Sequence, residues 1–576
     1  MPQQGAHIGA VHARYSRKSR MKEETFARET ALNGQATVER KPGRFWWLIS
    51  RYWAEAVVVA IALLLWAPRL SGPIDLRWDG GFYYVLGTSL ATGQGYRILS
   101  EPGSPEALRY PPLLPGIVAV CQRALGSTDP AVVGPWLRIL YAVLFLGYAL
   151  AALALAKRYL RPVFAVIAVA FSLLQPNTIF LSDLLYTEIP FAFISILFVL
   201  VAVNGPFSSR PCLRELASFV LAGAGFLLRT AGVALLAAWV LEAFIRRRWR
   251  LALARGFLAM LPIIAWEAYG ARVTASYEYA HPAYAYQRAP YHAYNGSYAE
   301  SIGLIDPSYP GWRHLRLSGL TNHLRANTHP LIESFGEAIS TSRRVPTLVL
   351  SALAMVGLAM LVRRRAWMML LIVFGSVAVI WPLPWPNQFY RYLVPLAPFL
   401  MIGVMVVFDD LWAALSALPV RHVIAILGRI ELAALVAFAF VLQMPSVWKL
   451  FYDRAVRGAS YVPGRGAVGP RYFYYSEFSR GWDVVVAWIQ GHSDPNAIVA
   501  THLPHLCYLR TGRRAVLPPE ERNQDRMREL LNSVPVSYII LDAFDSMPAV
   551  EKDNQHWRDV QSVDRVRLYE RISGAE

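Results

Sequence analysis

Long apolar stretches alternate with short polar segments over most of this chain. Windows that approach or exceed the roughly 18 apolar residues typical of a membrane span recur between residues 52 and 443. Hydrophobic residues make up 55% of the chain, more than in ordinary soluble domains. The pattern predicts an α-helical polytopic membrane protein of about eleven spans. The clearest windows are residues 136–156, 189–203, 231–245, 346–362, 366–381, 392–408 and 430–443.

Positive charge marks one side of the predicted spans. The chain has 57 Lys and Arg against 39 Asp and Glu, a formal net charge of +18. Threading the spans in order places four basic clusters on the same face, which the positive-inside rule makes cytoplasmic. The distribution of positive charge therefore indicates which ends of the spans face the cytoplasm. Because the sequence has no basic stretch interleaved with aromatic residues, we expect no nucleic-acid partner. The clusters lie at residues 157–161, 210–214, 246–250 and 363–365.

The two ends of the chain differ from its apolar middle. Residues 1–44 are polar and basic and lack the apolar core and cleavage site of a signal peptide, so we expect a disordered cytoplasmic tail. Residues 45–444 contain the predicted spans and form the transmembrane domain. Residues 445–576 combine strand-like runs with helical stretches, which favours a small periplasmic α/β domain. The strand-like runs are 497–500, 536–541 and 566–569, and the helical stretches are 481–490 and 520–531.

Four polar loops lie on the predicted outer side. Within the first loop, the apolar segment 110–125 is short and opens with a proline pair, so we expect it to lie in the membrane interface. A tyrosine-rich stretch in the third loop, residues 277–298, suits sugar stacking or a lid, although an interfacial aromatic belt gives the same pattern. The loops cover residues 69–135, 175–188, 270–345 and 382–391.

Carboxylates in the first two outer loops are candidates for catalysis. Asp79 is followed by two glycines, which permit a tight turn and close approach of a substrate. A charge beside the low-dielectric membrane is costly for stability but well placed for chemistry on a lipid-borne phosphate. We predict Asp79 as a general base, although a helix N-cap would use the same residue type. Asp183 and Glu188, exposed in the second loop, are expected to complete an acidic pocket, with a helix-dipole role as the alternative for Glu188.

Three arginines lie at predicted outer ends of spans, where the positive-inside rule disfavours them. These are Arg109, Arg229 and Arg391. The planar guanidinium group suits a phosphate, so we predict an anionic lipid headgroup as their ligand. Snorkelling of the side chains to membrane headgroups is the alternative.

Cysteine and histidine give no comparable signal. The three cysteines, Cys121, Cys212 and Cys507, have neither metal-ligand spacing nor a disulfide framework. A disulfide bond between Cys121 and Cys507 stays an alternative, but free structural thiols are the favoured interpretation. The short pair His502 and His505 does not indicate a metal site.

Five short motifs, in this order and all on the predicted outer side, resemble the GT-C superfamily of membrane glycosyltransferases. The chain looks most like the branch of protein O-mannosyltransferases and lipid A aminoarabinose transferases. The resemblance covers residues 44–443, and it rests on the order and common placement of the motifs rather than on any single one. The motifs are residues 79–84, 93–96, 109–115, 187–190 and 387–395.

The resemblance implies an inverting glycosyltransferase that uses a polyprenyl-phosphate-linked sugar on the periplasmic face of the bacterial inner membrane. Asp79 matches the position of the base and Glu188 that of the second-loop acid, while Arg109 and the pair Arg391-Tyr392 match residues near the donor phosphate. We assign Arg229 to the same phosphate site and expect three tyrosines in the substrate pocket. These are Tyr83, Tyr84 and Tyr110.

Several features of this activity stay open. The single acid at Asp79 departs from the Asp-Glu pair of protein mannosyltransferases, so the acceptor is a lipid, a glycan or a protein. The resemblance allows a divalent metal, but no ligand set in the sequence shows one, and the cofactor is unknown. A membrane polysaccharide polymerase or ligase is the alternative function. A transporter is less favoured, because its ionisable residues would lie in mid-span rather than at outer span ends.

Overall fold

The structure is a computed structural model of the full chain. The chain divides between Ala56 and Val57, and residues 1–43 of the predicted disordered tail lie outside the described residues. Both candidate cavities and the C-terminal domain belong to the unit Val57–Glu576. The described residues are 44–204, 209–288, 294–303, 315–340, 344–417, 423–456, 459–462, 466–519, 521–542 and 547–572.

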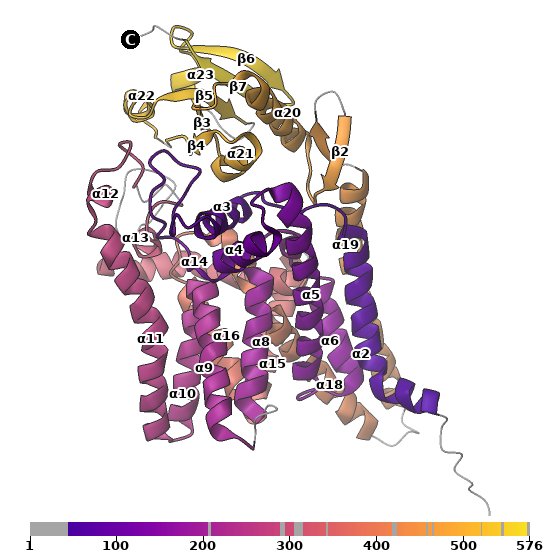
Figure 1. The fold of residues 1–576 in the computed structure, drawn as a ribbon. Coiled ribbons are helices and arrows are strands. Elements are labelled where there is room, and N and C mark those ends of the chain that lie inside the picture. Colours follow the sequence, from indigo (N-terminus) through magenta and orange to yellow (C-terminus); the bar gives the residue numbers. More distant parts are fainter. Residues whose placement is uncertain are drawn as a thin grey trace, which may run out of the picture. The chain divides into compact units, whose positions relative to one another are not determined.

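Helices make up nearly all of the described chain before residue 457 (Figure 1). Seven helices among the described residues are long and apolar enough to cross a membrane, or eight if a pair bent by 57° counts as one span. Four shorter apolar helices accompany them. The predicted polytopic helical fold is therefore confirmed, whereas the number of eleven spans stays a prediction. The long helices are α2 (Arg44–Trp66), α5 (Pro130–Ala156), α9 (Pro211–Leu228), α11 (Trp249–Thr274), α15 (Arg344–Arg363), α18 (Ala397–Ala417) and α19 (Val423–Val456), and the bent pair is α6 (Pro162–Leu173) and α7 (Pro176–Asp183).

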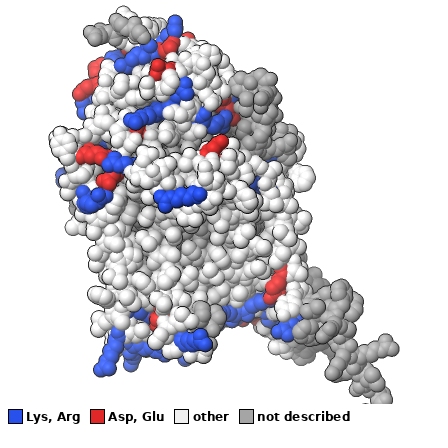
Figure 2. All heavy atoms as spheres, in the orientation of Figure 1, with Lys and Arg blue, Asp and Glu red and all other residues white. Residues whose placement is uncertain are grey.

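On the face drawn in Figure 2, the middle of these helices shows almost no charged residue and forms an uncharged band. Large side chains on α11 face outward there, with Leu253 76% and Phe257 72% exposed. Contiguous apolar surface of this kind is unfavourable in water and favourable in lipid. Lys and Arg gather at the end of the helices remote from the C-terminal domain, below the uncharged band (Figure 2). The chain is a multi-pass membrane protein.

Short helices and turns at the end of the bundle that faces the C-terminal domain, together with the apolar helices α8, α10 and α16 within the bundle, complete the helical region (Figure 1). The segment 110–125, predicted to lie in the membrane interface, contains the short helix α4. A single 3-10 turn, η2, separates α9 from α10. These elements are α3 (Asp79–Ala91), α4 (Leu113–Leu125), α8 (Glu188–Asn204), η2 (Thr230–Gly232), α10 (Val233–Ile245), α12 (Tyr277–Ala280), α13 (Tyr298–Ile302), α16 (Trp367–Ile380), η3 (Pro386–Gln388), α17 (Phe389–Leu393) and η4 (Val394–Leu396).

Two predicted outer loops have a different structure from the one expected. The segment 182–190, predicted to be exposed, is buried, because α7 ends at Asp183 and α8 begins at Glu188 within the packed bundle. Residues 270–345, predicted to be a long polar loop, contain the helix α14 (Leu317–Ile339). Its buried face, which includes Leu331 and Phe335, explains why a polar segment folds as a helix here. Helix α19 continues to Val456, beyond residue 444.

The C-terminal domain is built on a mixed five-stranded sheet in the order β4-β3-β5-β7-β6. Strand β3 pairs in parallel with β4 and β5, and β7 pairs antiparallel with β5 and β6. The strands predicted at 497–500, 536–541 and 566–569 correspond to β3, β5 and β7. The elements are β1 (Ala459–Val462), β2 (Gly466–Arg471), α20 (Glu477–His492), β3 (Ile498–Ala500), α21 (Pro504–Thr511), β4 (Arg514–Val516), α22 (Gln524–Asn532), β5 (Val536–Leu541), α23 (Pro548–Glu551), β6 (Trp557–Val563) and β7 (Val566–Arg571).

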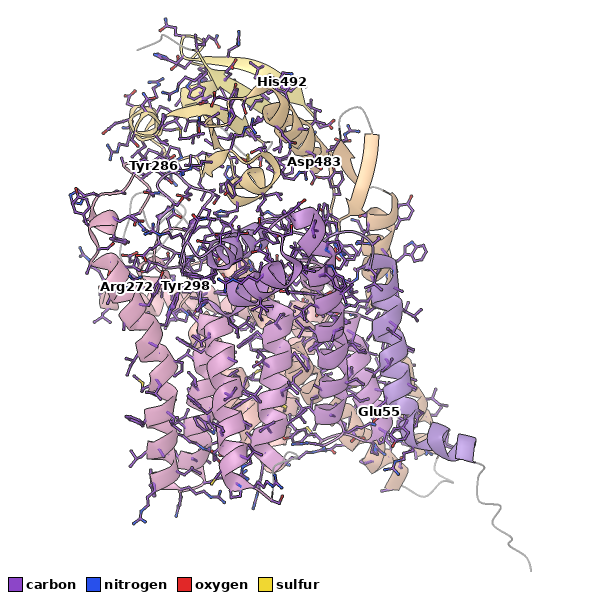
Figure 3. The ribbon with its side chains drawn as sticks, in the orientation of Figure 1. Glu55, Arg272, Tyr286, Tyr298, Asp483 and His492 are labelled. Atoms are coloured by element: carbon purple, nitrogen blue, oxygen red, sulfur yellow. The ribbon has the colours of Figure 1, made fainter. Side chains whose placement is uncertain are left out.

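The C-terminal domain contacts the helical region through hydrogen bonds and packed side chains at several points. The backbone N–H of Ala515 donates to the carbonyl of Ser100 at 2.7 Å, and the Ser100 hydroxyl lies 2.7 Å from Nδ1 of His505. Tyr284 and Tyr286, from the segment after α12, pack into the core of the C-terminal domain (Figure 3). The domain therefore folds around a piece of the preceding outer loop, which fixes its position over the helices.

The closest packing at this junction involves Gly81, at the start of α3. A Cβ atom at this position would lie 2.9 Å from the carbonyl oxygen of Leu76 and 3.2 Å from Cβ of His505 on α21. Only glycine permits this approach. The glycine pair after Asp79 thus brings α3 against the protein's own backbone and against α21, rather than admitting a substrate as the sequence suggested.

We predict that Gly81→Ala loosens the C-terminal domain. The added methyl group must displace backbone atoms, which costs about 1–3 kcal/mol of stability. Thermal unfolding and limited proteolysis of the purified protein would measure the change. Gly116→Ala, on α4 with no atom within 4 Å of the added carbon, is the matched control and should leave both readouts unchanged. Equal stability of the two variants would contradict the packing described.

Candidate active site

Asp79 is the first residue of α3, and its side chain faces other side chains rather than capping the helix. The N-cap position is Trp78, which makes no side-chain capping bond. Trp78 has φ 53° and ψ −126°, a region that favours glycine. This strained turn directs the buried Asp79 carboxylate toward the ends of α8 and α17. The N-cap alternative for Asp79 is therefore not the arrangement found.

Arg391, on α17, bridges two carboxylates that are far apart in the sequence. Its Nη2 lies 2.5 Å from Oδ2 of Asp79, and its Nε lies 2.6 Å from Oε1 of Glu188. Glu188 begins α8 and is fully buried. Charge-assisted bonds from one planar guanidinium group therefore fix the starts of α3 and α8 relative to α17.

Further polar groups surround the two carboxylates. Arg229, the extended residue at the end of α9, places Nη1 3.0 Å from Oε1 of Glu188. The hydroxyls of Tyr110 and Tyr294 lie 3.4 Å and 3.3 Å from Oδ1 of Asp79, and both donate to it. Burial and the nearby Asp79 charge raise the pKa of both tyrosines, which keeps them protonated as donors.

All of these groups except Glu188 line a cavity of about 190 Å³. Arg109 also faces it, with its guanidinium carbon 4.7 Å from the ring centroid of Tyr298 and 5.2 Å from that of Trp385. The side chain donates to Ser301, and among the described residues it has no carboxylate partner. Three arginines thus face two carboxylates, which leaves the cavity one positive charge in excess and suited to an anion.

The predicted site residues divide between this cavity and other places. Seven of them line it, while Glu188 lies directly behind it, bonded to Arg229 and Arg391. Tyr84 points elsewhere, since its hydroxyl donates to the carbonyl of Thr128 at 2.9 Å. Asp183 also lies elsewhere. The seven are Asp79, Tyr83, Arg109, Tyr110, Arg229, Arg391 and Tyr392.

Asp183 belongs to a separate buried ion cluster rather than to an acidic pocket with Asp79. Its Oδ1 lies 2.9 Å from Nη1 of Arg138 and 3.9 Å from Nη1 of Arg69, and Arg454 approaches its Oδ2 at 3.6 Å. All four side chains are 5% exposed or less. The carboxylate balances part of the charge of three arginines, so its role there is structural.

Sequence reasoning missed some of the residues around the cavity. Trp385 and Gln388 come from the outer turn before Arg391, and Gln388 accepts a 2.9 Å hydrogen bond from Tyr392. Gln388 lies within the motif 387–395 but the sequence assigns it no role, and no sequence pattern marks Trp385. Tyr294 and Tyr298, from the tyrosine-rich stretch that the sequence singled out, also line the cavity; residues 289–293 of that stretch lie outside the described residues.

The described residues give no sign of a metal-ligand cluster: no group of three or more His, Cys, Asp or Glu side chains among them is placed to hold an ion. The guanidinium group of Arg391 lies between Asp79 and Glu188.

Comparison with known proteins supports the fold. No protein-family model matches the chain, and no curated protein matches it. ArnT from Cupriavidus metallidurans bound to undecaprenyl phosphate matches with a TM-score of 0.51 at 13% identity, over 90% of this chain and 98% of that one. This likeness shows that the two chains share a fold over most of their length. The oligosaccharyltransferase of Archaeoglobus fulgidus in complex with Zn and sulfate matches at 0.50 and 13% identity, over 85% of this chain and 68% of that one.

The separate location of Asp183 leads to a prediction. Asp183→Asn leaves three buried arginines without their counter-charge, and breaking such a cluster costs about 3–5 kcal/mol. We expect a large fall in the unfolding temperature of the purified protein. Asp129→Asn, which retains an oxygen to cap α5 at the surface, is the control and should unfold like the wild type. A variant at 183 with unchanged stability would exclude the structural role.

Proposed function

We propose that this protein transfers a sugar from a polyprenyl-phosphate-linked donor to an acceptor hydroxyl, with inversion at the anomeric carbon. The observation that carries the proposal is the cavity in which Asp79 meets Arg109, Arg229 and Arg391. A carboxylate and an excess of guanidinium groups are what a glycosyl transfer from a phosphate leaving group requires. The match to ArnT, which is bound to undecaprenyl phosphate in that structure, agrees with such a donor.

Arg109 is the best candidate for first contact with the donor phosphate. It is buried and held in place by two aromatic rings, and its Nε lacks a hydrogen-bond partner among the described residues. A buried donor without a partner costs free energy that an arriving phosphate oxygen would recover. Arg391 and Arg229 lie on the same cavity and would share the charge that develops on the leaving phosphate.

The donor would also free an oxygen of the base. In the structure the Asp79 carboxylate binds Arg391 through Oδ2 at 2.5 Å. A phosphate in the cavity competes for the same guanidinium group, because Arg391 offers several N–H donors. If Arg391 turns toward the phosphate, Oδ2 of Asp79 can meet the acceptor hydroxyl, while Oδ1 keeps the bonds from Tyr110 and Tyr294.

The proposed step is a single displacement. The acceptor oxygen forms a bond to the anomeric carbon while its proton passes to Asp79. The bond from that carbon to the phosphate oxygen breaks, and the electron pair leaves with the polyprenyl phosphate. Stabilisation of this leaving group by a positioned cation contributes about 3–4 kcal/mol.

The position of the cavity supports transfer at a membrane surface. All of its charged residues lie at or beside helix ends facing the C-terminal domain, whereas the basic clusters around Arg246 and Arg364 lie between helices at the opposite end. By the positive-inside rule the cavity then faces the periplasm of a bacterial inner membrane. A polymerase or ligase would use the same cavity with a glycan acceptor. A transporter is less favoured, because the charged residues of this cavity lie at the helix ends.

We expect Asp79→Asn to abolish most transfer. The amide cannot accept the acceptor's proton, so the rate should fall by about 10²–10⁴-fold, while the polyprenyl-phosphate carrier still binds. The measurement is transfer of radiolabelled sugar from polyprenyl-phosphate donors to membrane extracts, alongside binding of undecaprenyl phosphate. Asp129→Asn, at a helix start outside the cavity, is the control and should be fully active. Wild-type activity of the Asp79 variant would exclude Asp79 as the general base.

Arg109→Ala should weaken binding of the polyprenyl-phosphate carrier rather than remove the base. Loss of a cation that contacts the phosphate should weaken undecaprenyl-phosphate binding by at least about tenfold, which corresponds to about 1.4 kcal/mol. Arg272→Ala is the control, since this exposed arginine pairs with Glu106 near the same helix ends but does not line the cavity. Titration of the purified variants with the carrier lipid measures both affinities. Equal affinities of the Arg109 and Arg272 variants for the carrier lipid would show that Arg109 does not contact the phosphate.

A further inference from the structure

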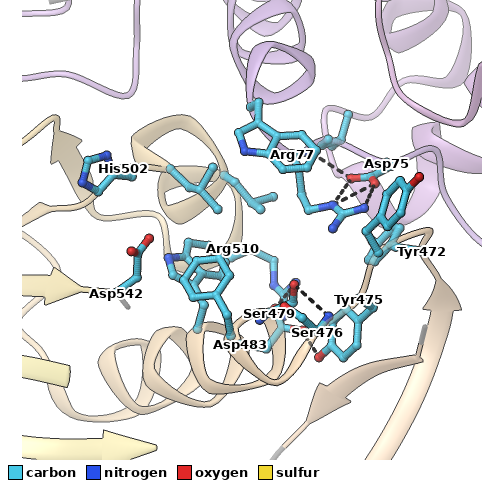
Figure 4. Close-up of a pocket in the computed structure, with 17 residues that line it drawn as sticks. Asp75, Arg77, Tyr472, Tyr475, Ser476, Ser479, Asp483, His502, Arg510 and Asp542 are labelled. Carbon is cyan, nitrogen blue, oxygen red and sulfur yellow. Dashed lines mark hydrogen bonds and ion pairs between the residues drawn. The ribbon is translucent and has the colours of Figure 1, made fainter. Parts of the chain in front are cut away.

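A second and larger cavity, of about 530 Å³, lies between the turn before α3 and the C-terminal domain (Figure 4). Its volume is within the range of about 300–1,000 Å³ that small-molecule sites occupy. The walls come from residues 75–78, from the segment that follows β2, and from α20 and α21. It is distinct from the Asp79 cavity, because no residue lines both.

Aromatic rings form much of this wall. Trp78, Tyr472, Tyr474, Phe478 and Trp482 all line the cavity. Trp78 and Tyr474 are also 41% and 48% exposed, although large aromatic side chains gain most when buried. Both rings contact the ring of Phe180, and the guanidinium group of Arg77 lies over that of Trp78. The ring surface that these contacts leave exposed is suited to a flat apolar face of a ligand.

The backbone supports this interpretation. Trp78 has φ 53° and Tyr474 has φ 55°, so both exposed aromatic residues occupy a conformation that favours glycine. Neither aromatic ring is deeply buried, so burial does not offset the cost of the backbone conformation. Unfavourable backbone conformations of this kind persist where a side chain is needed in a set position, and they cluster at ligand sites.

Polar groups complete the wall and nearly balance in charge. Arg77 binds Asp75 with contacts of 2.6–3.1 Å, and Arg510 lies 3.4 Å from Asp483. His502 and Asp542 lie at the other end of the cavity from the Asp75–Arg77 pair (Figure 4). Paired charges of this kind offer hydrogen bonds without a strong net field, so they suit a neutral polyhydroxylated ligand better than a phosphate.

We propose that this cavity binds a neutral saccharide. The apolar C–H face of a sugar ring would pack on Trp78 and Tyr474, and its hydroxyls would bond to Arg510, Asp483 and the groups at the far end. Trp78 and Asp79 are consecutive residues that line the larger and the smaller cavity respectively, so the two cavities share the turn before α3. Assignment of the saccharide as part of the acceptor rests on the proposed function, whereas saccharide binding itself does not.

The test uses the full chain in lipid nanodiscs, because glycoside detergents would compete for the site. Maltotriose, cellotriose and mannotriose are offered at millimolar concentration, and binding is read by saturation-transfer NMR on the sugar protons. We expect a signal from at least one of them with the wild type. Tyr474→Gly removes the ring and also relieves the backbone strain, so it should raise the dissociation constant at least tenfold without lowering the unfolding temperature.

Tyr452→Ala is the matched control, since Tyr452 is 49% exposed on α19 and does not line the cavity. This variant should bind like the wild type. No signal with the wild type, or a signal that persists unchanged in Tyr474→Gly, would overturn the proposal; the latter result would place saccharide binding elsewhere, including the Asp79 cavity. Because no step of this test measures transfer, its failure is distinguishable from failure of the proposed function.

Discussion

The arrangement of the site depends on one buried guanidinium group. Arg391 holds Asp79 and Glu188 at 2.5 Å and 2.6 Å, and with them the starts of α3 and α8. Removing three such charges from water costs several kcal/mol each, and only close, well-directed bonds offset this cost. The bonds here are short and come from two nitrogens of the guanidinium group, Nε and Nη2. The positions of the helix ends and the charge of the cavity are therefore set by the same contacts.

Buried ion clusters occur elsewhere in the molecule, and comparison with them shows what distinguishes the site. Arg255, on α11, binds Glu215 and Glu242 at 2.8 Å and 2.9 Å, and Asp183 binds three arginines. Neither cluster lines one of the two cavities described above. The two clusters around Arg255 and Asp183 therefore only cross-link helices, whereas the cluster around Arg391 faces an open cavity. The candidate active site differs from these structural ion pairs in its access to a cavity, and not in the types of charge it contains.

The sequence was most informative where one local feature determines the outcome. Apolar runs predicted the helical bundle, and short runs rich in β-branched residues predicted three strands of the C-terminal sheet, because burial selects both patterns. Asp79 and Arg391 could be singled out because charges at the outer ends of apolar segments are unusual. Asp183 shares this property, and only its long-range partners Arg69, Arg138 and Arg454 reveal the difference. Such contacts join residues that are 45 to 271 positions apart in the sequence, and they leave no local pattern.

The turn formed by residues 77–81 links the two cavities physically. Trp78 lines the larger cavity, Asp79 lines the smaller one, and Gly81 packs against α21 of the C-terminal domain. A shift of α21 would therefore move the backbone that positions the Asp79 carboxylate. Because Tyr284 and Tyr286 anchor the outer loop in the core of the same domain, that shift is resisted at a second point. The C-terminal domain thus acts as a support for the strained turn at Trp78, which the helical bundle alone does not enclose.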